Sequence, residues 1–391
     1  ERAKLYAPDG NIYGFASIEG ENFDLPGARC FINEKWINEL GLDMPETYDE
    51  FYNVLIAFRD NDPDGNGKDD TIPLSGISSS YSVDPFVAGP LGIPFGNRKS
   101  NWMIKNDKIV YVPADPIHVE YLSRMKKLYS EKLLDQEYFT QNDAQMKAKG
   151  QKLLIGAYQY AAHFVLTSST DPEVYGQYSI INPLTSKYQP EKIWYGDWIA
   201  NPTIFITSAN QNPEATVRYF DLLYTEEYAK LLYGPELGQW EGEGGIKWNE
   251  DHTEFEVVVP DGYVGIWEWL CKEVSPIGCG IMGAFKKTDF IGKEKKAPED
   301  AHFKQDMIEK VFPYLQPAFP TLYFTNEEQE KVSLIETDLQ TYVEQMEAKF
   351  ILGEESLEQH DAFVDRLKSM RLDELVEIYQ AAYERYKANI D

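Results

Sequence analysis

An acidic loop carries oxygen-bearing side chains at alternate positions. Counting from Asp62 as position 1, positions 3, 5 and 9 are Asp64, Asn66 and Asp70. Position 6 is Gly67, which permits a sharp turn, and this turn brings the carbonyl of Lys68 at position 7 inward. Because Ca²⁺ prefers about six to eight oxygen ligands, the spacing predicts a calcium loop formed by Asp62, Asp64, Asn66, Asp70 and the Lys68 carbonyl.

The loop lacks the last ligand of an EF-hand. Position 12 is Pro73, where an EF-hand carries a bidentate glutamate, and no clear helix pattern follows. We therefore favour a structural Ca²⁺ that joins a helix to the next strand over a regulatory sensor that opens a pair of helices. The alternative is a metal-free turn rich in Asp, Asn and Gly. Calcium is preferred because acidic ligands at this spacing repel one another without a cation.

Aromatic rings and a carboxylate gather in a second segment. Residues 194–198 contain Trp194, Tyr195, Asp197 and Trp198, and Trp240 and the pair Trp267 and Trp269 follow in glycine-rich surroundings. Flat rings stack on the C–H faces of sugars while carboxylates and amides bind the hydroxyl groups. The segment therefore indicates a sugar-binding surface, with core packing as the alternative for any single tryptophan.

Catalytic patterns are scarce by comparison. The sequence has no GxSxG or GxxxxGK motif, and its five histidines, His118, His163, His252, His302 and His360, have no metal-ligand spacing. Two carboxylates at the separation that glycosidases use remain an open possibility. Cys271 and Cys279 are near enough in sequence to form a disulfide in an oxidising compartment, and two small buried thiols are the alternative.

Composition excludes several classes of partner. The 391 residues carry a formal net charge of −28 at pH 7, which repels nucleic-acid backbones and anionic lipid. A hydrophobic fraction of 43% with 14% aromatic residues is sufficient for a large core. The length fits two domains or one large one, and no stretch approaches the ~20 consecutive apolar residues of a membrane-spanning helix.

Periodicity predicts helices that alternate with short strands. Helices are expected over 47–60, where Thr47 and Glu50 form a capping box, and over 116–131, 143–152 and 213–231. The last of these turns Val217, Phe220, Leu223 and Tyr228 inward. Apolar runs between Pro and Gly over 153–206 are typical of α/β domains. From 326 onward, three charged amphipathic helices are expected to pack on the α/β body.

Several stretches resemble the extracellular solute-binding proteins, family 1, of bacterial ABC importers, in particular the large oligosaccharide-binding and alginate-binding lipoproteins. The matching stretches are 9–15 (DGNIYGF), 31–37 (FINEKWI), 40–51 (LGLDMPETYDEF), the loop 62–74, 134–140 (LDQEYFT), 212–215 (NPEA), 341–344 (TYVE) and 349–354 (KFILGE). The resemblance runs over nearly the whole chain, although the family's lipoprotein signal and the first part of its first lobe are not matched.

The resemblance implies an α/β, two-lobed periplasmic-binding-protein-like fold of type II with a helical C-terminal region. Lobe 1 would comprise 1–13 and 183–290 and would be incomplete at its N-terminal side. Lobe 2 would comprise 14–182, with the calcium loop at 60–71. Residues 291–391 would form helices packed on the lobes. Chain crossings near 13–18 and 178–183 would close the lobes on a ligand by a hinge. The same resemblance gives the calcium ligands as Asp62, Asp64, Asn66, Lys68 and Asp70.

The function implied is non-enzymatic. The protein would bind an oligosaccharide between the lobes through Trp194, Tyr195, Asp197, Trp198 and Trp240, and present the closed form to the transmembrane subunits of an ABC permease. It would be a monomeric extracellular lipoprotein, or periplasmic, held at the membrane only by a lipid anchor outside this chain. A secreted polysaccharide-degrading enzyme and a cleft protein for peptides or other solutes are the alternatives.

Overall fold

The computed structural model describes residues 5–19, 29–167, 171–196, 199–225, 244–263, 269, 272–273, 284–285, 303, 305–317 and 319–390. The chain divides into two compact units. Unit 1 comprises Glu1–Leu25, Asp197–Lys304 and Asn389–Asp391, and unit 2 comprises Pro26–Gly196 and Gln305–Ala388. These bounds differ from those expected for the lobes, and the division into lobes stays a prediction.

Unit 2 is built on a four-stranded mixed sheet. Its strands are β2 (Arg29–Asn33), β3 (Ile72–Ser75), β6 (Ile155–Tyr160) and β7 (Tyr178–Ile180), in the order β3-β6-β2-β7. Every residue of β2 and β6 is buried, as expected for strands covered on both faces. A separate hairpin pairs β4 (Trp102–Lys105) with β5 (Lys108–Tyr111).

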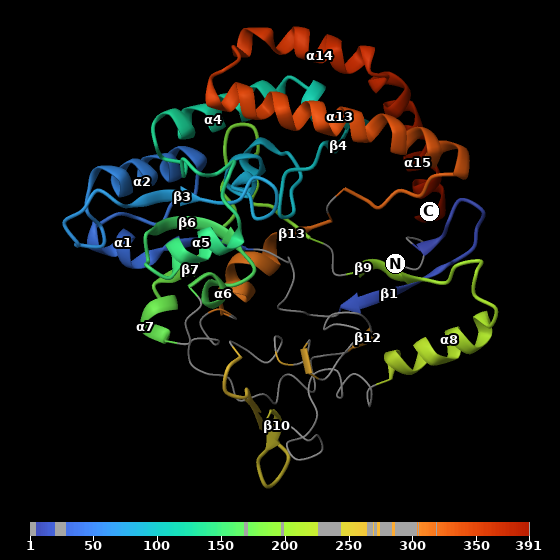
Figure 1. Ribbon diagram of the computed structural model, residues 1–391, viewed down its shortest axis with the longest axis horizontal. Helices are drawn as coiled ribbons and strands as arrows, with labels where there is room; N and C mark the ends of the chain where they lie inside the picture. The colour runs from blue at the N-terminus through green and yellow to red at the C-terminus, as the bar shows by residue number, and fades with distance from the viewer. Residues whose placement is uncertain are drawn as a thin grey trace. The chain divides into compact units, whose positions relative to one another are not determined.

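In the described residues of the first half of unit 2, seven α-helices accompany this sheet, and Figure 1 labels most of them. They are α1 (Glu34–Glu39), α2 (Tyr48–Asp60), α3 (Asp84–Val87), α4 (Ile117–Ser130), α5 (Asp143–Gly150), α6 (His163–Thr167) and α7 (Pro172–Tyr175). The capping box predicted for α2 is confirmed, because Thr47 accepts from the Glu50 amide and Glu50 accepts from the Thr47 amide. Phe51, Leu55 and Phe58 of α2 are fully buried, as their spacing predicts.

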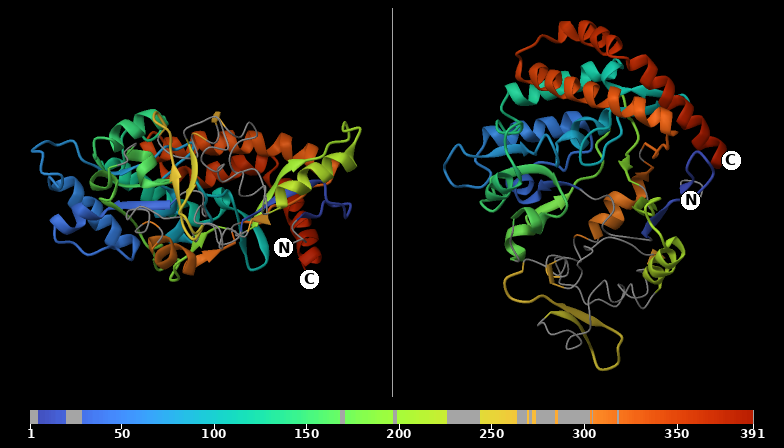
Figure 2. Two further views of the ribbon diagram at one scale, coloured as in Figure 1. Left: turned by 90° about the horizontal axis from the view of Figure 1, so that it is seen from below. Right: turned by 45° about the vertical axis from the view of Figure 1, so that its right-hand side comes forward.

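The C-terminal helices belong to unit 2. They are α13 (Asn326–Leu352), α14 (His360–Ser369) and α15 (Leu372–Ile390), and α13 lies beside α4 (Figures 1 and 2). The sequence predicts an apolar stripe of Val332, Ile335, Leu339, Tyr342, Met346 and Phe350 on α13. Val332, Ile335, Leu339 and Phe350 are buried as predicted, whereas Met346 is only partly buried. Val343, rather than the partly exposed Tyr342, completes it. The helix ends at Gly353, which adopts a left-handed φ of 79°.

Unit 1 contains a three-stranded sheet in the order β12-β1-β9, formed by β1 (Gly14–Glu19), β9 (Ile199–Phe205) and β12 (Ala284–Phe285). It also contains a hairpin of β10 (Gly245–Trp248) and β11 (Phe255–Val258). Helix α8 covers Pro213–Asp221, followed by a 3₁₀ turn at Leu222–Tyr224.

The prediction of an inward Val217 on α8 is wrong, because this side chain is 45% exposed. Phe220 packs on Phe15 with ring centroids 5.0 Å apart. The side chain of Leu223 and all of Tyr228 lie outside the described residues.

Within the described part of the chain, no helix has both the length and the apolar character needed to cross a bilayer.

A buried line of polar groups joins the C-terminal helices to the rest of unit 2. The Lys99 ammonium lies 2.8 Å from Glu347 Oε1 on α13, and the same oxygen lies 2.9 Å from His118 Nε2 on α4. His118 Nδ1 lies 3.1 Å from His360 Nε2 on α14. Only one proton fits between these two nitrogens, so protonating both rings is unfavourable.

The histidine pair predicts a loss of stability in mild acid. Burial, and then the neighbouring His118, lowers the pKa of His360 to about 4, below its usual value of 6.5, and burial also lowers the pKa of His118. The unfolded chain binds these protons more readily than the folded one. The neutral histidine pair therefore contributes fully to the free energy of unfolding above pH 6.5, and this contribution declines as the pH falls toward 4. We expect the titration of His360 alone to lower the free energy of unfolding by about 2 kcal/mol between pH 7 and pH 5.

Chemical denaturation of the wild type and of His360→Gln at both pH values measures this effect. The variant should lose less stability on acidification, whereas His252→Gln, in an exposed turn, should behave as the wild type. Equal pH dependence in all three proteins would contradict the role of the pair.

Candidate functional site

Three strands of the unit 2 sheet end at one edge. Because β3 runs parallel to β6, and β2 runs antiparallel to β6 and β7, the carboxyl ends of β3, β6 and β7 lie together with the start of β2 at Arg29. Ligands of open α/β sheets bind outside the carboxyl ends of the strands. This edge is therefore the place in unit 2 where a binding site is expected.

A pair of tyrosines lies at the edge. The rings of Tyr81, in the loop after β3, and Tyr160, the last residue of β6, have centroids 4.3 Å apart and are tilted by 37°. Tyr160 is buried and donates its hydroxyl hydrogen to Asp143, whereas Tyr81 is partly exposed. Burial and the hydrogen bond to Asp143 raise the pKa of Tyr160, so this hydroxyl group is uncharged at neutral pH. Of the two rings, that of Tyr81 is the one accessible to a ligand.

A buried amide lies on the other face of the same strand. Successive side chains of a strand point to opposite faces, and Gln159, 1% exposed, donates from Nε2 to the carbonyl of Gly96 at 2.8 Å. Its Oε1 has no hydrogen-bond partner among the described residues. At the start of β2, Arg29 donates from Nη1 to the carbonyl of Ala161 at 2.8 Å. The buried Gln159 amide and the Tyr160 ring thus lie on opposite faces of β6, and neither Gln159 nor Tyr81 was singled out from the sequence.

Two of the predicted sugar-binding residues lie near the same loop. Trp194 and Tyr195 form β8 (Trp194–Tyr195), which pairs in parallel with β13 (Leu315–Gln316). Their ring centroids lie 5.9 Å and 5.2 Å from that of Phe95, the neighbour of Gly96. Tyr195 is partly exposed. Trp194 is 2% exposed and its indole N–H donates to the carbonyl of Lys310 at 3.0 Å, which favours core packing for this ring.

The other predicted positions are not placed at this edge. Asp197, Trp198, Trp240, Trp267, Cys271 and Cys279 lie outside the described residues. Trp269 is described and is 3% exposed.

A buried ionic network holds the chain between β3 and Tyr81. Asp135 accepts hydrogen bonds from the Lys149 ammonium and the Ser75 hydroxyl, both at 2.7 Å, and from Gln141 Nε2 at 3.1 Å. Gln141 also donates to the carbonyl of Gly76 at 2.6 Å. Because Ser75 ends β3 and Gly76 begins the following loop, this network fixes the direction in which the loop leaves the sheet.

The predicted calcium loop connects α2 to β3, so its position between a helix and a strand is confirmed. Backbone amides of Asn66 and Gly67 donate to the Asp62 carboxylate at 3.2 Å and 2.7 Å. Asn66 Nδ2 lies 2.6 Å from Asp64 Oδ2 and 3.0 Å from Asp70 Oδ1. Both carboxylates therefore converge on one amide.

The described residues contain no group of three or more His, Cys, Asp or Glu side chains arranged to hold a metal ion. The acidic loop combines its carboxylates with an asparagine and backbone atoms, and Gly65 and Gly67 have the left-handed φ values of 67° and 73° that tighten the turn. In this geometry the loop is a hydrogen-bonded Asx turn, which is the alternative to a calcium loop.

Among the described residues near the edge, the cysteine thiol and the histidine ring are buried in the packing and are not exposed to a ligand. Burial raises the pKa of the Cys30 thiol, which is 2% exposed. The His163 ring is 3% exposed, with centroids of Phe31 and Tyr175 at 5.6 Å and 5.0 Å. His118, His163 and His360 are thus packed residues, as expected, although the sequence did not indicate that His118 and His360 meet.

Comparison with known proteins shows what the chain is similar to. No model of a protein family matches the chain. It is 26% identical over 400 residues to the fructooligosaccharide ABC transporter substrate-binding protein FusA of Streptococcus pneumoniae, an alignment that covers 99% of this chain and 72% of FusA. Over nearly its whole length the chain is therefore similar to a solute-binding protein of an ABC transporter.

Two further relatives are from Bacillus subtilis. Lipoprotein LipO is 34% identical over 151 residues, covering 36% of this chain and 29% of LipO. The polygalacturonan/rhamnogalacturonan-binding protein YtcQ is 21% identical over 396 residues, covering 97% of this chain and 71% of YtcQ.

Solved structures confirm the predicted fold class, the α/β fold of two-lobed periplasmic binding proteins. FusA with kestose superposes with a TM-score of 0.76 at 23% identity, over 99% of this chain and 79% of FusA. The alginate-binding protein AlgQ2 without calcium superposes with a TM-score of 0.69 at 20% identity, over 98% of this chain and 76% of AlgQ2.

The network at Asp135 predicts a stability effect. Asp135→Asn removes the charge that faces the Lys149 ammonium, so we expect a loss of about 1.5–3 kcal/mol in the free energy of unfolding, measured by urea denaturation. Asp338→Asn, on the exposed face of α13, is the control and should change stability by less than about 0.5 kcal/mol. Equal stability of Asp135→Asn and the wild type would contradict the supporting role of this network.

Proposed function

We propose that this solute-binding protein captures a neutral oligosaccharide and delivers it to the transmembrane permease subunits of an ABC transporter. The observation that carries the proposal is the partly exposed ring of Tyr81, which packs against the buried ring of Tyr160 at the carboxyl edge of the unit 2 sheet. An accessible aromatic ring that stacks on C–H groups provides the apolar part of sugar recognition.

The relatives support the same class of ligand. FusA is named as a fructooligosaccharide-binding protein and its structures contain kestose and fructo-nystose, which are neutral. YtcQ is named as a binder of polygalacturonan, which is anionic. We favour a neutral ligand because a net charge of −28 repels anions approaching this protein.

The proposal needs no covalent step and places the protein outside the cytoplasm. Likeness to LipO supports a lipoprotein at the cell surface or in the periplasm, and monomeric operation is part of the proposal. Trp194, Tyr195, Asp197, Trp198 and Trp240 stay predictions as ligand contacts, with Tyr195 better supported than the buried Trp194.

Calcium is proposed as a structural ion. A structure of a FusA EF-hand mutant supports such a loop in that relative. In this chain, Asp64, Asn66 and Asp70 lie within one short turn, and their side-chain oxygens are of the kind that Ca²⁺ prefers as ligands. Asp62, Asp64, Asn66, Asp70 and the Lys68 carbonyl would hold the ion, which would neutralise the loop and tie the end of α2 to the start of β3.

Thermal unfolding with and without calcium tests the ion. Calcium at about a hundredfold its Kd should stabilise the wild type by ~2.7 kcal/mol and so raise its Tm. EDTA should reverse this increase in Tm. Asp64→Asn should remove this response. Asp69→Asn, the same charge change at position 8 of the loop, should retain it. A wild-type Tm that neither calcium nor EDTA changes would contradict the calcium proposal.

Isothermal titration with kestose, fructo-nystose and oligogalacturonides tests the ligand. We expect a neutral oligosaccharide to bind, and Tyr81→Ala to weaken binding at least about tenfold, or ~1.4 kcal/mol, because a stacking surface is lost. Tyr188→Ala, at an exposed tyrosine in the same unit, is the matched control and should leave affinity unchanged.

The sugar recovered after the titration should be intact. Release of shorter products would instead support the alternative of a polysaccharide-degrading enzyme. Unchanged affinity in Tyr81→Ala would remove the sheet edge from the binding site.

A further inference from the structure

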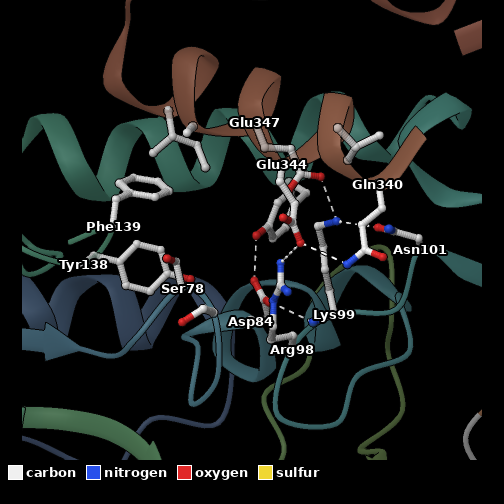
Figure 3. A pocket seen from close by; sticks show the side chains of 15 residues that line it. Ser78, Asp84, Arg98, Lys99, Asn101, Tyr138, Phe139, Gln340, Glu344 and Glu347 are labelled. Atoms are coloured by element: carbon white, nitrogen blue, oxygen red, sulfur yellow. Dashed lines mark hydrogen bonds and ion pairs between the residues drawn. The ribbon is translucent and has the colours of Figure 1, made fainter. Parts of the chain in front are cut away.

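A polar pocket of about 210 Å³ lies in unit 2 beneath α13 (Figure 3). It is bounded by α13, by the loop that contains Ser78 and Ser79, and by the loop that contains Arg98 and Lys99. A single buried water needs only roughly 10–15 Å³, and pockets for drug-sized ligands start at about 300 Å³. The size therefore suits one small molecule comparable to a single sugar ring.

One wall of the pocket is aromatic and apolar. Tyr138 and Phe139 meet edge to face with centroids 5.0 Å apart, and Phe139 is partly exposed. Val343 and Ile351 of α13 extend the apolar surface, and Figure 3 shows Ser78 next to Tyr138. This wall can pack against the C–H face of a ligand while the serine hydroxyls bind its polar groups.

The opposite wall carries charges that are already paired. Arg98 Nη2 lies 2.9 Å from Glu344 Oε1, and the Lys99 ammonium lies 2.8 Å from Glu347 Oε1. Asp84 accepts the Tyr121 hydroxyl hydrogen at 2.6 Å and the Lys99 amide hydrogen at 2.7 Å. An anion would face three carboxylates, and a cation would compete with Arg98 or Lys99 for them. A neutral ligand breaks neither pair, so the cost of separating buried charges is avoided.

Gln340 completes the polar wall. Its Nε2 donates to Glu344 Oε1 at 3.1 Å, and Figure 3 shows its amide directed toward Lys99 and Asn101. The amide oxygen and the Asn101 side chain add neutral hydrogen-bonding groups to those of the two serines. Facing an aromatic wall, these groups match a molecule with hydroxyls around an apolar ring.

We propose that this pocket is a second binding site, which takes one small neutral polyol or a single sugar ring. The site is distinct from the sheet edge, because the loop 96–99 separates them: Gly96 accepts from Gln159 at the edge, whereas Arg98 and Lys99 line the pocket. The inference stands on the chemistry of the pocket and does not require the sheet edge to bind an oligosaccharide.

Saturation-transfer NMR with myo-inositol as a neutral probe and glucuronate as an anionic one tests the site. The wild type should bind myo-inositol saturably in the millimolar range and should not bind glucuronate. Ser79→Trp, which fills the pocket from an exposed position, should abolish the signal, and Gln340→Leu should weaken binding about fivefold or more. Gln345→Leu, on the exposed face of the same helix, is the matched control and should bind within about twofold of the wild type.

The Tyr81→Ala variant separates this site from the proposed function, because it should bind myo-inositol as the wild type does. Circular dichroism and thermal unfolding establish that each variant is folded. If Ser79→Trp does not fold, Gln340→Leu is the smaller change that still tests the pocket. The proposal is overturned if the wild type shows no saturable binding of myo-inositol up to roughly 50 mM, or if Ser79→Trp and Gln340→Leu, both folded, bind it as the wild type does.

Discussion

The close packing of β6 is the constraint on which the rest of unit 2 depends. All six residues of this strand are buried, and it pairs with β3 on one side and β2 on the other. A Cβ atom at Gly156 would lie 2.5 Å from the Phe58 ring and 2.7 Å from the carbonyl of Pro73, so only glycine allows α2 to approach this closely. Phe58 lies in the last turn of α2, just before the acidic loop, and the strand register places Gln159 and Tyr160 at the sheet edge.

The long helix α13 connects segments that are distant in sequence. Its inner face packs on α4 through an apolar stripe, and Glu347 brings Lys99 and His118 to the same carboxylate oxygen. Burial alone would raise the pKa of Glu347. Lys99 and His118 instead hold this pKa at about 2, so the Glu347 carboxylate is charged at neutral pH. The loop 96–99 is consequently anchored at both ends, by Gln159 at the sheet and by α13 above the polar pocket.

Local patterns of the sequence predicted the local structure well. The capping box at Thr47 and Glu50 determined the start of α2, and the stripe from Val332 to Phe350 determined the buried face of α13. The prediction that Val217 points inward was wrong, because periodicity predicts an apolar face of a helix but does not specify what covers that face. The sheet edge was missed because Tyr81 and Tyr160 meet only through strand pairing, and the contact between His118 and His360 spans 242 residues. Such contacts depend on topology, which short-range spacing does not encode.

Hydrogen exchange with and without a bound neutral oligosaccharide tests the central claim most directly. If the carboxyl edge of the unit 2 sheet holds the sugar, backbone amides in 76–82, 96–99 and 160–163 should exchange more slowly when kestose, or whichever neutral oligosaccharide binds in the titration, is present at saturation. Saturating ligand that leaves the exchange of all three segments unchanged would contradict the assignment of this edge as the binding site.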